Sequence, residues 1–267
     1  MELTMLGTGH AAVTECYNTC FLLNDDGHYF LTDGGGGNGL LRQLSHGGFD
    51  WRDIHEIFVT HKHLDHIMGI LWMVRLICQS LDHGSYRGEV NIYGHKGVIH
   101  AIRSIGEELL LPRESAFIGE RLHLITVSDG ESRIINGRKV TFFDIGSTKE
   151  KQFGFCMEFD GGRKLVCCGD EPCHPCEEKY VRDCDWLLHE AFCLYAEADI
   201  FKPYEKHHST VKDACELAER LKAKNLVLYH TEDRNLADRK KLYTEEGRRY
   251  YSGRLYVPED LEKLEIC

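Results

Sequence analysis

Residues 60–66, with the sequence THKHLDH, constrain the fold more than any other part of this chain, because six consecutive positions hold three imidazoles and a carboxylate. Imidazole and carboxylate groups are the usual protein ligands of Zn²⁺, Mn²⁺ and Fe²⁺. Residues 54–60 have the pattern of a buried strand, and the apolar run 67–78 is typical of a buried helix. The cluster is therefore expected where a strand ends and a helix begins, which is where open α/β folds place their ligands.

The spacing within the cluster indicates two metal ions rather than one. His61 and His63 are two residues apart on an extended segment, so their side chains project to one side. Asp65 and His66 turn away with the chain, which allows one short loop to serve two metals side by side. The alternative is a histidine-rich surface loop, and four donor groups at this spacing favour the metal centre.

Length and charge limit the remaining possibilities. The chain has 267 residues, which predicts one domain over residues 1–267, and its formal net charge is −11. An acidic surface disfavours non-specific binding to nucleic acid. Twelve cysteines in a chain of this size, beginning MELTMLGTGH without a signal-peptide pattern, predict reduced thiols and a cytoplasmic location. The run 67–78 is shorter than a bilayer span, so no membrane association is expected.

Strands and helices alternate along the chain in two β-rich halves. Helices are expected over residues 40–47, 67–78, 96–110 and 210–222, the last with a capping-box pair, Thr210 and Asp213. Strands are expected over residues 2–6, 19–23, 29–32, 54–60 and 90–93, and in the second half over 122–127, 139–145, 153–159, 164–168, 186–189 and 226–229. Asp33 and the four glycines that follow it predict a loop that passes close to another segment. Two sheets flanked by helices, in a four-layer sandwich, are the predicted architecture.

Further metal ligands recur at the carboxyl ends of predicted strands. Asp170 follows the strand 164–168, and His230 follows the strand 226–229. Together with the histidine cluster they supply the ligand types of a two-metal hydrolytic site, in which one carboxylate bridges the ions and a shared water is deprotonated.

These motifs give the chain a resemblance to the metallo-β-lactamase superfamily, and most closely to its ribonuclease Z-like branch. The resemblance covers nearly the whole length and implies an αββα sandwich, in the α/β (α+β) class. The matching motifs are Leu6-Gly7-Thr8-Gly9, Asp33 with its glycines, His61-Lys62-His63-Leu64-Asp65-His66, Gly169-Asp170, His189-Glu190-Ala191, His208-Ser209-Thr210 and Leu228-Tyr229-His230.

The resemblance also implies a role for each polar residue. Two divalent metal ions are implied, of which Zn²⁺ is the first choice and Mn²⁺ or Fe²⁺ the alternatives. The implied ligands are His61 and His63 for one ion, Asp65, His66 and His230 for the other, and Asp170 as the bridge. Asp65 would also orient or deprotonate the attacking water. His208 would be the general acid and Glu190 its partner, since a carboxylate raises the pKa of an imidazole. His189 is expected to be structural.

One departure from the family pattern concerns the first metal ion. The family's third imidazole for that ion follows the strand at residues 140–143, where this chain has Asp144-Ile145-Gly146-Ser147-Thr148. The first ion should be held weakly or partly occupied unless Ser147, Asp144 or a water completes its shell.

The other departure concerns the substrate. Members that process transfer RNA carry a basic, glycine-rich arm, and residues 120–153 hold only short strands and turns. The primary prediction is therefore a phosphodiesterase acting on a small-molecule or nucleotide phosphodiester. Transfer RNA is a disfavoured substrate, and a ribonuclease Z-type endonuclease is the first alternative. A thioester, lactone or β-lactam hydrolase and a non-catalytic metal- or ligand-binding module are the others.

Three further predictions concern the edge of the pocket and the oligomeric state. Cys173-His174-Pro175-Cys176 has the C-x-x-C form of a redox or zinc half-site, but no second pair completes it, so it is expected to border the pocket entrance. Residues 202–206 are expected to form a mobile pocket edge that contacts the substrate. The family and the apolar run 67–78 also favour a homodimer.

Overall fold

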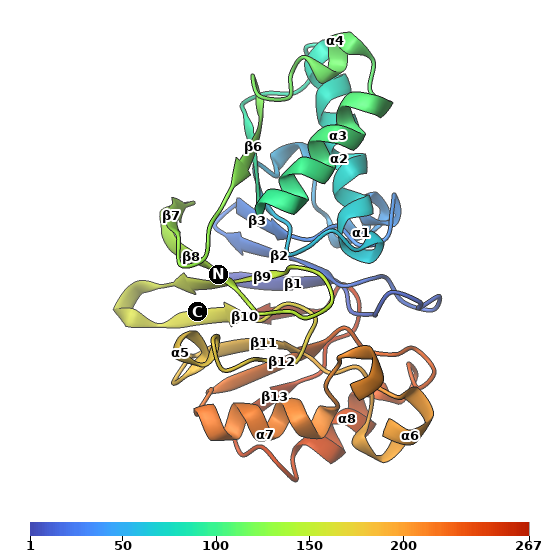
Figure 1. Ribbon diagram of the computed structural model, residues 1–267, viewed down its shortest axis with the longest axis vertical. Helices are drawn as coiled ribbons and strands as arrows, with labels where there is room; N and C mark the ends of the chain where they lie inside the picture. The colour runs from blue at the N-terminus through green and yellow to red at the C-terminus, as the bar shows by residue number, and fades with distance from the viewer. Residues whose placement is uncertain (267) are drawn as a thin grey trace. The chain divides into compact units, whose positions relative to one another are not determined.

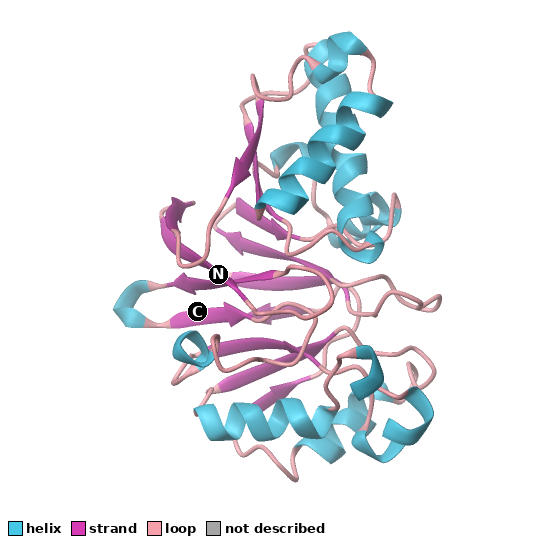
Figure 2. Ribbon diagram, viewed as in Figure 1, coloured by secondary structure: helices cyan, strands magenta, loops and turns pink. Residues whose placement is uncertain are grey.

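The computed structural model describes residues 1–266, which form two seven-stranded sheets with helices (Figures 1 and 2). The chain divides into two compact units. Unit 1 contains Met1–Gly7, Tyr17–Val127 and the segment that begins at Asp260, and unit 2 contains Thr8–Cys16 and Ser128–Glu259. The predicted fold class, with two sheets and flanking helices, is confirmed.

The sheet of unit 1 has an antiparallel part and a parallel part. Its order is β14 (Lys263–Glu265), β1 (Glu2–Gly7), β2 (Cys20–Asp25), β3 (His28–Thr32), β4 (Glu56–Phe58), β5 (Val90–Gly94) and β6 (Leu122–Thr126). Neighbours are antiparallel from β14 to β3 and parallel from β3 to β6. The parallel strands are joined through α1 (Gly39–Gly47), the 3₁₀ turn η1 (Trp51–Asp53), α2 (Leu64–Asp82), α3 (Lys96–Leu109) and α4 (Pro112–Ser115). Such crossovers bring the carboxyl ends of the strands to one edge.

Helix α2 is longer than the apolar run that predicted it. It begins at Leu64, with His63 in an extended conformation at its N-cap, so Asp65 and His66 lie in its first turn and not in a loop. The prediction missed this turn because its polar residues interrupt the apolar pattern. With 19 residues, α2 has the length and composition of a membrane-spanning helix, but more than half of its apolar window is buried inside the protein. Most of its apolar residues therefore belong to the core of unit 1, whereas Leu64 and Trp72 are exposed.

The glycine-rich loop after β3 runs against α2, as predicted. A Cβ atom on Gly69 would lie 1.8 Å from the carbonyl oxygen of Gly34, and one on Gly34 would lie 2.5 Å from the backbone nitrogen of Ile70. Gly35 has a φ of +68°, which favours glycine. Gly37 alone in this run has open space around its Cβ position and no positive φ. The small residues thus allow the first turns of α2 to approach the end of β3.

The sheet of unit 2 repeats the arrangement of the first one. Its order is β13 (Arg254–Tyr256), β12 (Asn225–Tyr229), β11 (Trp186–Glu190), β10 (Lys164–Cys167), β9 (Phe153–Glu158), β8 (Arg138–Asp144) and β7 (Ser132–Ile135). Neighbours are antiparallel from β7 to β10 and parallel from β10 to β13. The other elements are α5 (Glu178–Val181), α6 (Ala198–Phe201), α7 (Val211–Leu221), α8 (Arg239–Gly247) and the 3₁₀ turns η2 (Asp160–Gly162), η3 (Tyr195–Glu197) and η4 (Tyr204–Lys206).

Three details of the helices and strands bear on the sequence predictions. The capping box of α7 is present, with Thr210 accepting from the N–H of Asp213. The strand expected at 122–127 in the second half is β6 of unit 1, because it pairs in parallel with β5 from Val90 to Gly94. Strands β7, β13 and β14 were not predicted, since three or four residues carry too little alternation to be recognised.

Candidate metal centre

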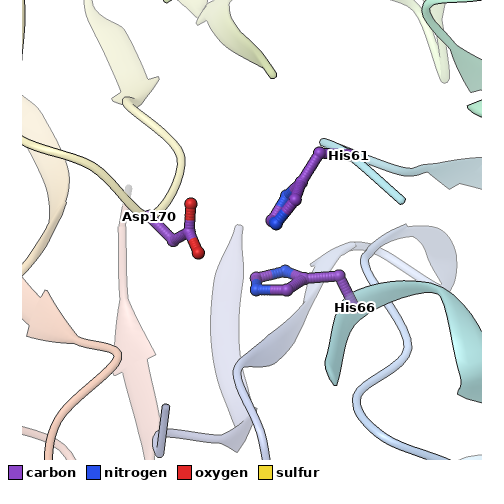
Figure 3. Close-up of side chains that lie close together, drawn as sticks. All are labelled: His61, His66 and Asp170. Atoms are coloured by element: carbon purple, nitrogen blue, oxygen red, sulfur yellow. The ribbon is translucent and has the colours of Figure 1, made fainter. Parts of the chain in front are cut away.

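In unit 1, the histidine cluster gathers its donor atoms around the start of α2. The Nε2 atom of His61 lies 2.8 Å from Nδ1 of His63, and the rings of His61 and His66 have centroids 4.1 Å apart. The Nε2 atom of His66 lies 3.4 Å from Oδ2 of Asp65. Figure 3 draws His61 on the segment after β4 and His66 on α2, with their rings turned toward one another. All four predicted ligands of unit 1 are therefore brought together.

Asp33, at the end of β3, fixes the orientation of two of these imidazoles. Its Oδ2 accepts from Nδ1 of His66 at 2.8 Å and from the hydroxyl of Thr60 at 2.8 Å. That hydroxyl lies 2.9 Å from Nδ1 of His61 and accepts its proton. Both imidazoles are thereby held with Nδ1 protonated and Nε2 available to a metal ion, which is the usual second layer around a metal site. The donor set thus fits a divalent cation.

Asp33 was recognised in the sequence only as part of a family motif and was not predicted as a site residue. One signal was available in the sequence, because Asp33 directly follows the apolar strand β3. In the structure it adopts a φ of +58°, which is uncommon for residues other than glycine. Its hydrogen bonds to residues 27 and 33 positions later in the chain are a property of the folded unit.

In unit 2, the predicted ligands lie beyond the ends of β10 and β12, the two parallel strands on either side of β11. Asp170 follows β10 after a turn at Gly169, whose φ is +75°, and His230 follows β12 directly (Figure 3 shows Asp170). The Nε2 atom of His230 lies 3.5 Å from Oδ2 of Asp170. The hydroxyl of Tyr229 donates to the carbonyl oxygen of Gly169 and so connects the two strand ends. The sequence prediction of a carboxylate and an imidazole at this edge is met by this geometry.

His208 and Glu190 lie beside His230 in the same unit. Glu190 ends β11, and its Oε2 is 3.6 Å from Nδ1 of His208, while its Oε1 accepts from the N–H of Ser209. One ligand atom from each of Glu190, His208 and His230 lies within 4.8 Å of the others. The ring of His208 stacks on Phe192 with centroids 5.0 Å apart and an interplanar angle of 6°.

The protonation of this pair is set mainly by burial. Burial, together with a smaller effect of the neighbouring His230, lowers the pKa of His208 to about 3. Burial also raises the pKa of Glu190 well above its usual value. Burial therefore favours the protonated form of Glu190 and the neutral form of His208. Glu190 orients His208 as a close polar neighbour rather than by raising its pKa through charge, as the sequence had suggested.

The residues proposed to replace the missing third imidazole have other partners in unit 2. The hydroxyl of Ser147 donates to Oε1 of Glu171 at 2.6 Å. The carboxylate of Asp144 accepts from the N–H of Gly146 at 2.9 Å and pairs with Lys151 at 3.0 Å. Ser147 and Asp144 thus have other partners, and a water is the remaining candidate for completing the shell of the first ion.

His10 was not predicted as a site residue, and the structure places it beside the site residues of unit 2. The segment Thr8–Cys16 reaches the end of β12 through a bridge between Gly9 and Thr231. The ring of His10 lies 4.6 Å from Phe192 and 6.3 Å from His230, measured between centroids. The bridge at Gly9 holds this loop next to His230, so the Gly7-Thr8-Gly9 motif has a structural role beside the site.

His189 and residues 202–206 also have defined surroundings. His189 is buried, which lowers its pKa to about 4. Its Nδ1 donates to the carbonyl oxygen of Glu190 at 2.7 Å, and its Nε2 accepts from the N–H of Cys173 at 3.2 Å. Lys149 donates to the carbonyl oxygen of Lys206 at 2.8 Å, so the segment expected to be a mobile edge is connected to the loop after β8.

Comparison with known proteins defines the class of this molecule. Its structure resembles that of the Bacillus subtilis metallo-β-lactamase fold protein YhfI, with a TM-score of 0.77 and 17% identity over 98% of both chains. It also resembles the short form of human tRNase Z, with a TM-score of 0.76 and 24% identity over 100% of both chains. Ribonuclease Z of Haloferax volcanii is 28% identical over 313 aligned positions, covering 100% of this chain and 95% of the relative. The protein is thus a hydrolase of the metallo-β-lactamase fold, close to ribonuclease Z.

The family can be given more narrowly. The model of the family described as "Anti-Pycsar protein Apyc1" matches residues 1–248, and the chain belongs to this family.

Proposed function

We propose that this protein is a phosphodiesterase that uses a metal-activated water and acts on a nucleotide or another small phosphodiester. The observation that carries this proposal is the pair of His208 and Glu190 beside His230. A phosphodiester has an alkoxide leaving group that needs a proton, whereas the thiolate of a thioester leaves without one. Membership of the family and the likeness to ribonuclease Z support the same reaction class.

Six residues are proposed as ligands of two divalent ions. The supporting observation in unit 1 is the set of imidazoles whose Nδ1 atoms are occupied by Asp33 and Thr60. We assign His61, His63, Asp65 and His66 of unit 1 and Asp170 and His230 of unit 2 to these ions. Zn²⁺ is the proposed metal, with Mn²⁺ or Fe²⁺ as alternatives, and the ion of His61 and His63 is the weaker one. When bound, the ions supply hydroxide at neutral pH and neutralise charge on the phosphoryl group.

Side chains of the protein carry out the proton transfers of the reaction. Asp65 orients or accepts a proton from the attacking water. In the free protein burial favours the protonated form of Glu190, whose Oε2 lies 3.6 Å from Nδ1 of His208. The negative charge of a bound phosphodiester raises the pKa of His208, so the proton moves to the imidazole as the substrate arrives. His208 then donates a proton to the leaving oxygen. Stacking on Phe192 fixes the plane of the His208 imidazole during this transfer.

The discriminating experiment compares leaving groups. His208→Ala should lower kcat/KM by about 10²–10⁴-fold for a nucleotide phosphodiester, whose leaving alkoxide needs a proton. The same variant should change turnover of bis-p-nitrophenyl phosphate much less, because p-nitrophenolate leaves without a proton. His207→Ala is the matched control, since His207 is the exposed neighbour that contacts Thr148. An equal loss on both substrates, or no loss on either, would refute the role of His208.

Transfer RNA is the second candidate substrate. The relatives named ribonuclease Z match over most or all of this chain, so the comparisons do not support the demotion of transfer RNA that the sequence suggested. Two observations support the small substrate instead. Residues 120–153 form only β6, β7 and β8 with short connections. The alignment with the Haloferax volcanii relative has 313 positions for the 267 residues of this chain, so this chain has gaps at 46 of those positions.

Binding at low salt separates the two substrates. A precursor transfer RNA that binds at low salt and is cleaved at its 3′ side identifies an endonuclease, and failure to bind at low salt excludes it. Full metal occupancy without turnover of any ester would favour the non-catalytic module instead.

The remaining expectations are a cytoplasmic location and a homodimer. The eleven cysteines of the described residues form no disulfide bond, which supports a reducing compartment. Exposed apolar side chains on α2 and α3, Trp72 and Leu109, support a contact between copies of the chain. Light scattering on the purified protein measures its mass directly.

A further inference from the structure

The two cysteines of the Cys173-His174-Pro175-Cys176 motif have different surroundings. The Sγ atom of Cys176 donates to the carbonyl oxygen of Ile145 at 3.4 Å. The Sγ atom of Cys173 instead lies in a cluster with Sγ of Cys168 and a carboxylate oxygen of Glu177, all within 4.8 Å of one another. The structure thus replaces the C-x-x-C pair of the sequence with a group of two thiols and a carboxylate.

The backbone of unit 2 holds these three groups in place. Cys168 follows β10, and Gly169, with a φ of +75°, turns the chain away from the strand. The N–H of Cys173 donates to Nε2 of His189 at 3.2 Å. Glu177 is the N-cap of α5, and its Oε1 accepts from the N–H of His174 at 2.7 Å. The three donor groups are therefore positioned by hydrogen bonds and not by contact with one another alone.

Burial makes this cluster unusual. Cys168 and Glu177 are both 0% exposed, and Cys173 is half-buried. The Oε2 atom of Glu177 makes no hydrogen bond within residues 1–266. Burial and the nearby Cys173 raise the pKa of Glu177 well above its usual value. A buried carboxyl group with an unsatisfied oxygen is costly, and a bound cation would remove that cost.

We propose that Cys168, Cys173 and Glu177 bind a thiophilic divalent cation of the Zn²⁺ type. Thiolate and carboxylate are both Zn²⁺ ligands, with Zn–S near ~2.3 Å, and a tetrahedral pair of such bonds sets the sulfurs roughly 3.8 Å apart. The separations in the cluster, all below 4.8 Å, allow this geometry with small movements. Three protein ligands leave a fourth position for water, which reaches the half-buried side of Cys173.

The position of this site in the chain gives it a consequence. Asp170, proposed above as the bridging ligand, lies between Cys168 and Cys173 in one loop. A cation on the two cysteines would fix both ends of that loop. Binding would also release the protons of both thiols and of the carboxyl group.

Cobalt substitution tests the site directly. The centre built from histidine and aspartate has no sulfur ligand, so a near-ultraviolet thiolate-to-Co²⁺ charge-transfer band reports the cysteine site alone. We expect this band in the wild-type protein, a loss of at least half of its intensity in Cys173→Ser, and an unchanged band in the matched control Cys176→Ser. Glu177→Gln should weaken the Co²⁺ affinity measured by titrating this band. The expected loss is at least the roughly 10–100-fold that removal of an outer-shell partner costs. No band with Co²⁺ in excess, or a band unaffected by Cys173→Ser, would overturn the proposal.

A measurement on the wild-type protein avoids dependence on variants that fold poorly. The full-length protein is alkylated with iodoacetamide with and without Zn²⁺, and the modified peptides are quantified by mass spectrometry. Zn²⁺ should slow modification of Cys173 several-fold and leave that of Cys176 unchanged. Equal rates for Cys173 with and without Zn²⁺, or recovery of a Cys168–Cys173 disulfide in protein kept under argon, would overturn the proposal.

Discussion

At the scale of single residues, the site depends on polar groups that hold other polar groups. Asp33 contacts both Thr60 and His66, and through Thr60 it also determines the tautomer of His61. In unit 2, His189 has a similar supporting position between Glu190 and Cys173. Such residues touch no substrate, yet they decide which nitrogen atom a metal ion would meet.

Asp33→Asn should lower the affinity for divalent metal by about 10–100-fold, because an amide does not accept both hydrogen bonds with the strength of a carboxylate. Equilibrium dialysis with Zn²⁺ or Mn²⁺ measures this change. Asp50→Asn is a suitable control, since Asp50 is a surface carboxylate that caps η1. Equal affinities for wild type and Asp33→Asn would show that Asp33 has no role in metal binding.

The buried imidazole of His189 should make the protein sensitive to acid. Its folded pKa of about 4 lies below the unfolded value of 6.5, so only the unfolded chain takes up this proton between those pH values. The free energy of unfolding therefore falls by up to about 3 kcal/mol from this residue as the pH decreases from ~6.5 to ~4.

Urea unfolding of metal-free protein across this range measures how steeply the free energy of unfolding depends on pH. His189→Gln should make this dependence shallower, whereas His28→Gln at the exposed first residue of β3 should not. The same slope in His189→Gln and wild type would contradict the assignment.

At the scale of elements, equivalent strands of the two units present polar residues at the same place. Asp33 follows β3 and Asp170 comes after β10, the strands at which each sheet changes from antiparallel to parallel pairing. His61 lies beyond β4, and Glu190 ends β11. Parallel strands joined by crossovers align their carboxyl ends, so this placement follows from the connection type.

The contact between the glycine loop and α2 should tolerate no side chain at Gly69. Gly69→Ala would place its Cβ 1.8 Å from the carbonyl oxygen of Gly34, and the displaced helix carries Asp65 and His66. We expect a loss of roughly 1–3 kcal/mol or more in unfolding free energy, with weaker metal binding. Gly37→Ala, with nothing near its Cβ, should unfold as wild type does. Urea midpoints that coincide for Gly69→Ala and Gly37→Ala would show that the contact is not tight.

At the scale of the whole molecule, neither unit is one continuous piece of chain. Unit 1 is made of three segments and unit 2 of two, so the chain passes between them four times. The first segment, β1, pairs with β14 near the other end of the chain. Each unit therefore needs distant parts of the sequence before it can fold, which supports the prediction of one domain over residues 1–267.

Thermal unfolding of the metal-free protein should accordingly show one transition, with equal calorimetric and van't Hoff enthalpies. Differential scanning calorimetry provides both values. Two separate transitions would instead indicate units that unfold independently and would contradict the single-domain prediction.

By itself, the sequence determined the elements and the edge at which the chemistry lies. Ligand spacing in residues 60–66, strand and helix periodicity and the Thr210 capping box are local patterns, and local patterns are written in consecutive residues. They sufficed for the fold class and for placing the proposed ligands after β4, β10 and β12. Where local pattern was weak, as in the first turn of α2 and in β7, β13 and β14, the prediction was incomplete.

Only the tertiary structure decided which distant groups meet and how they are protonated. It placed β6 in the first sheet, joined Asp33 to His66 and gathered Cys168, Cys173 and Glu177. It also reversed the expected effect on His208, whose pKa is lowered by burial although a carboxyl group lies beside it. The physical reason is the same in each case. Contacts and burial depend on segments that are far apart in the chain, and no window of consecutive residues contains them.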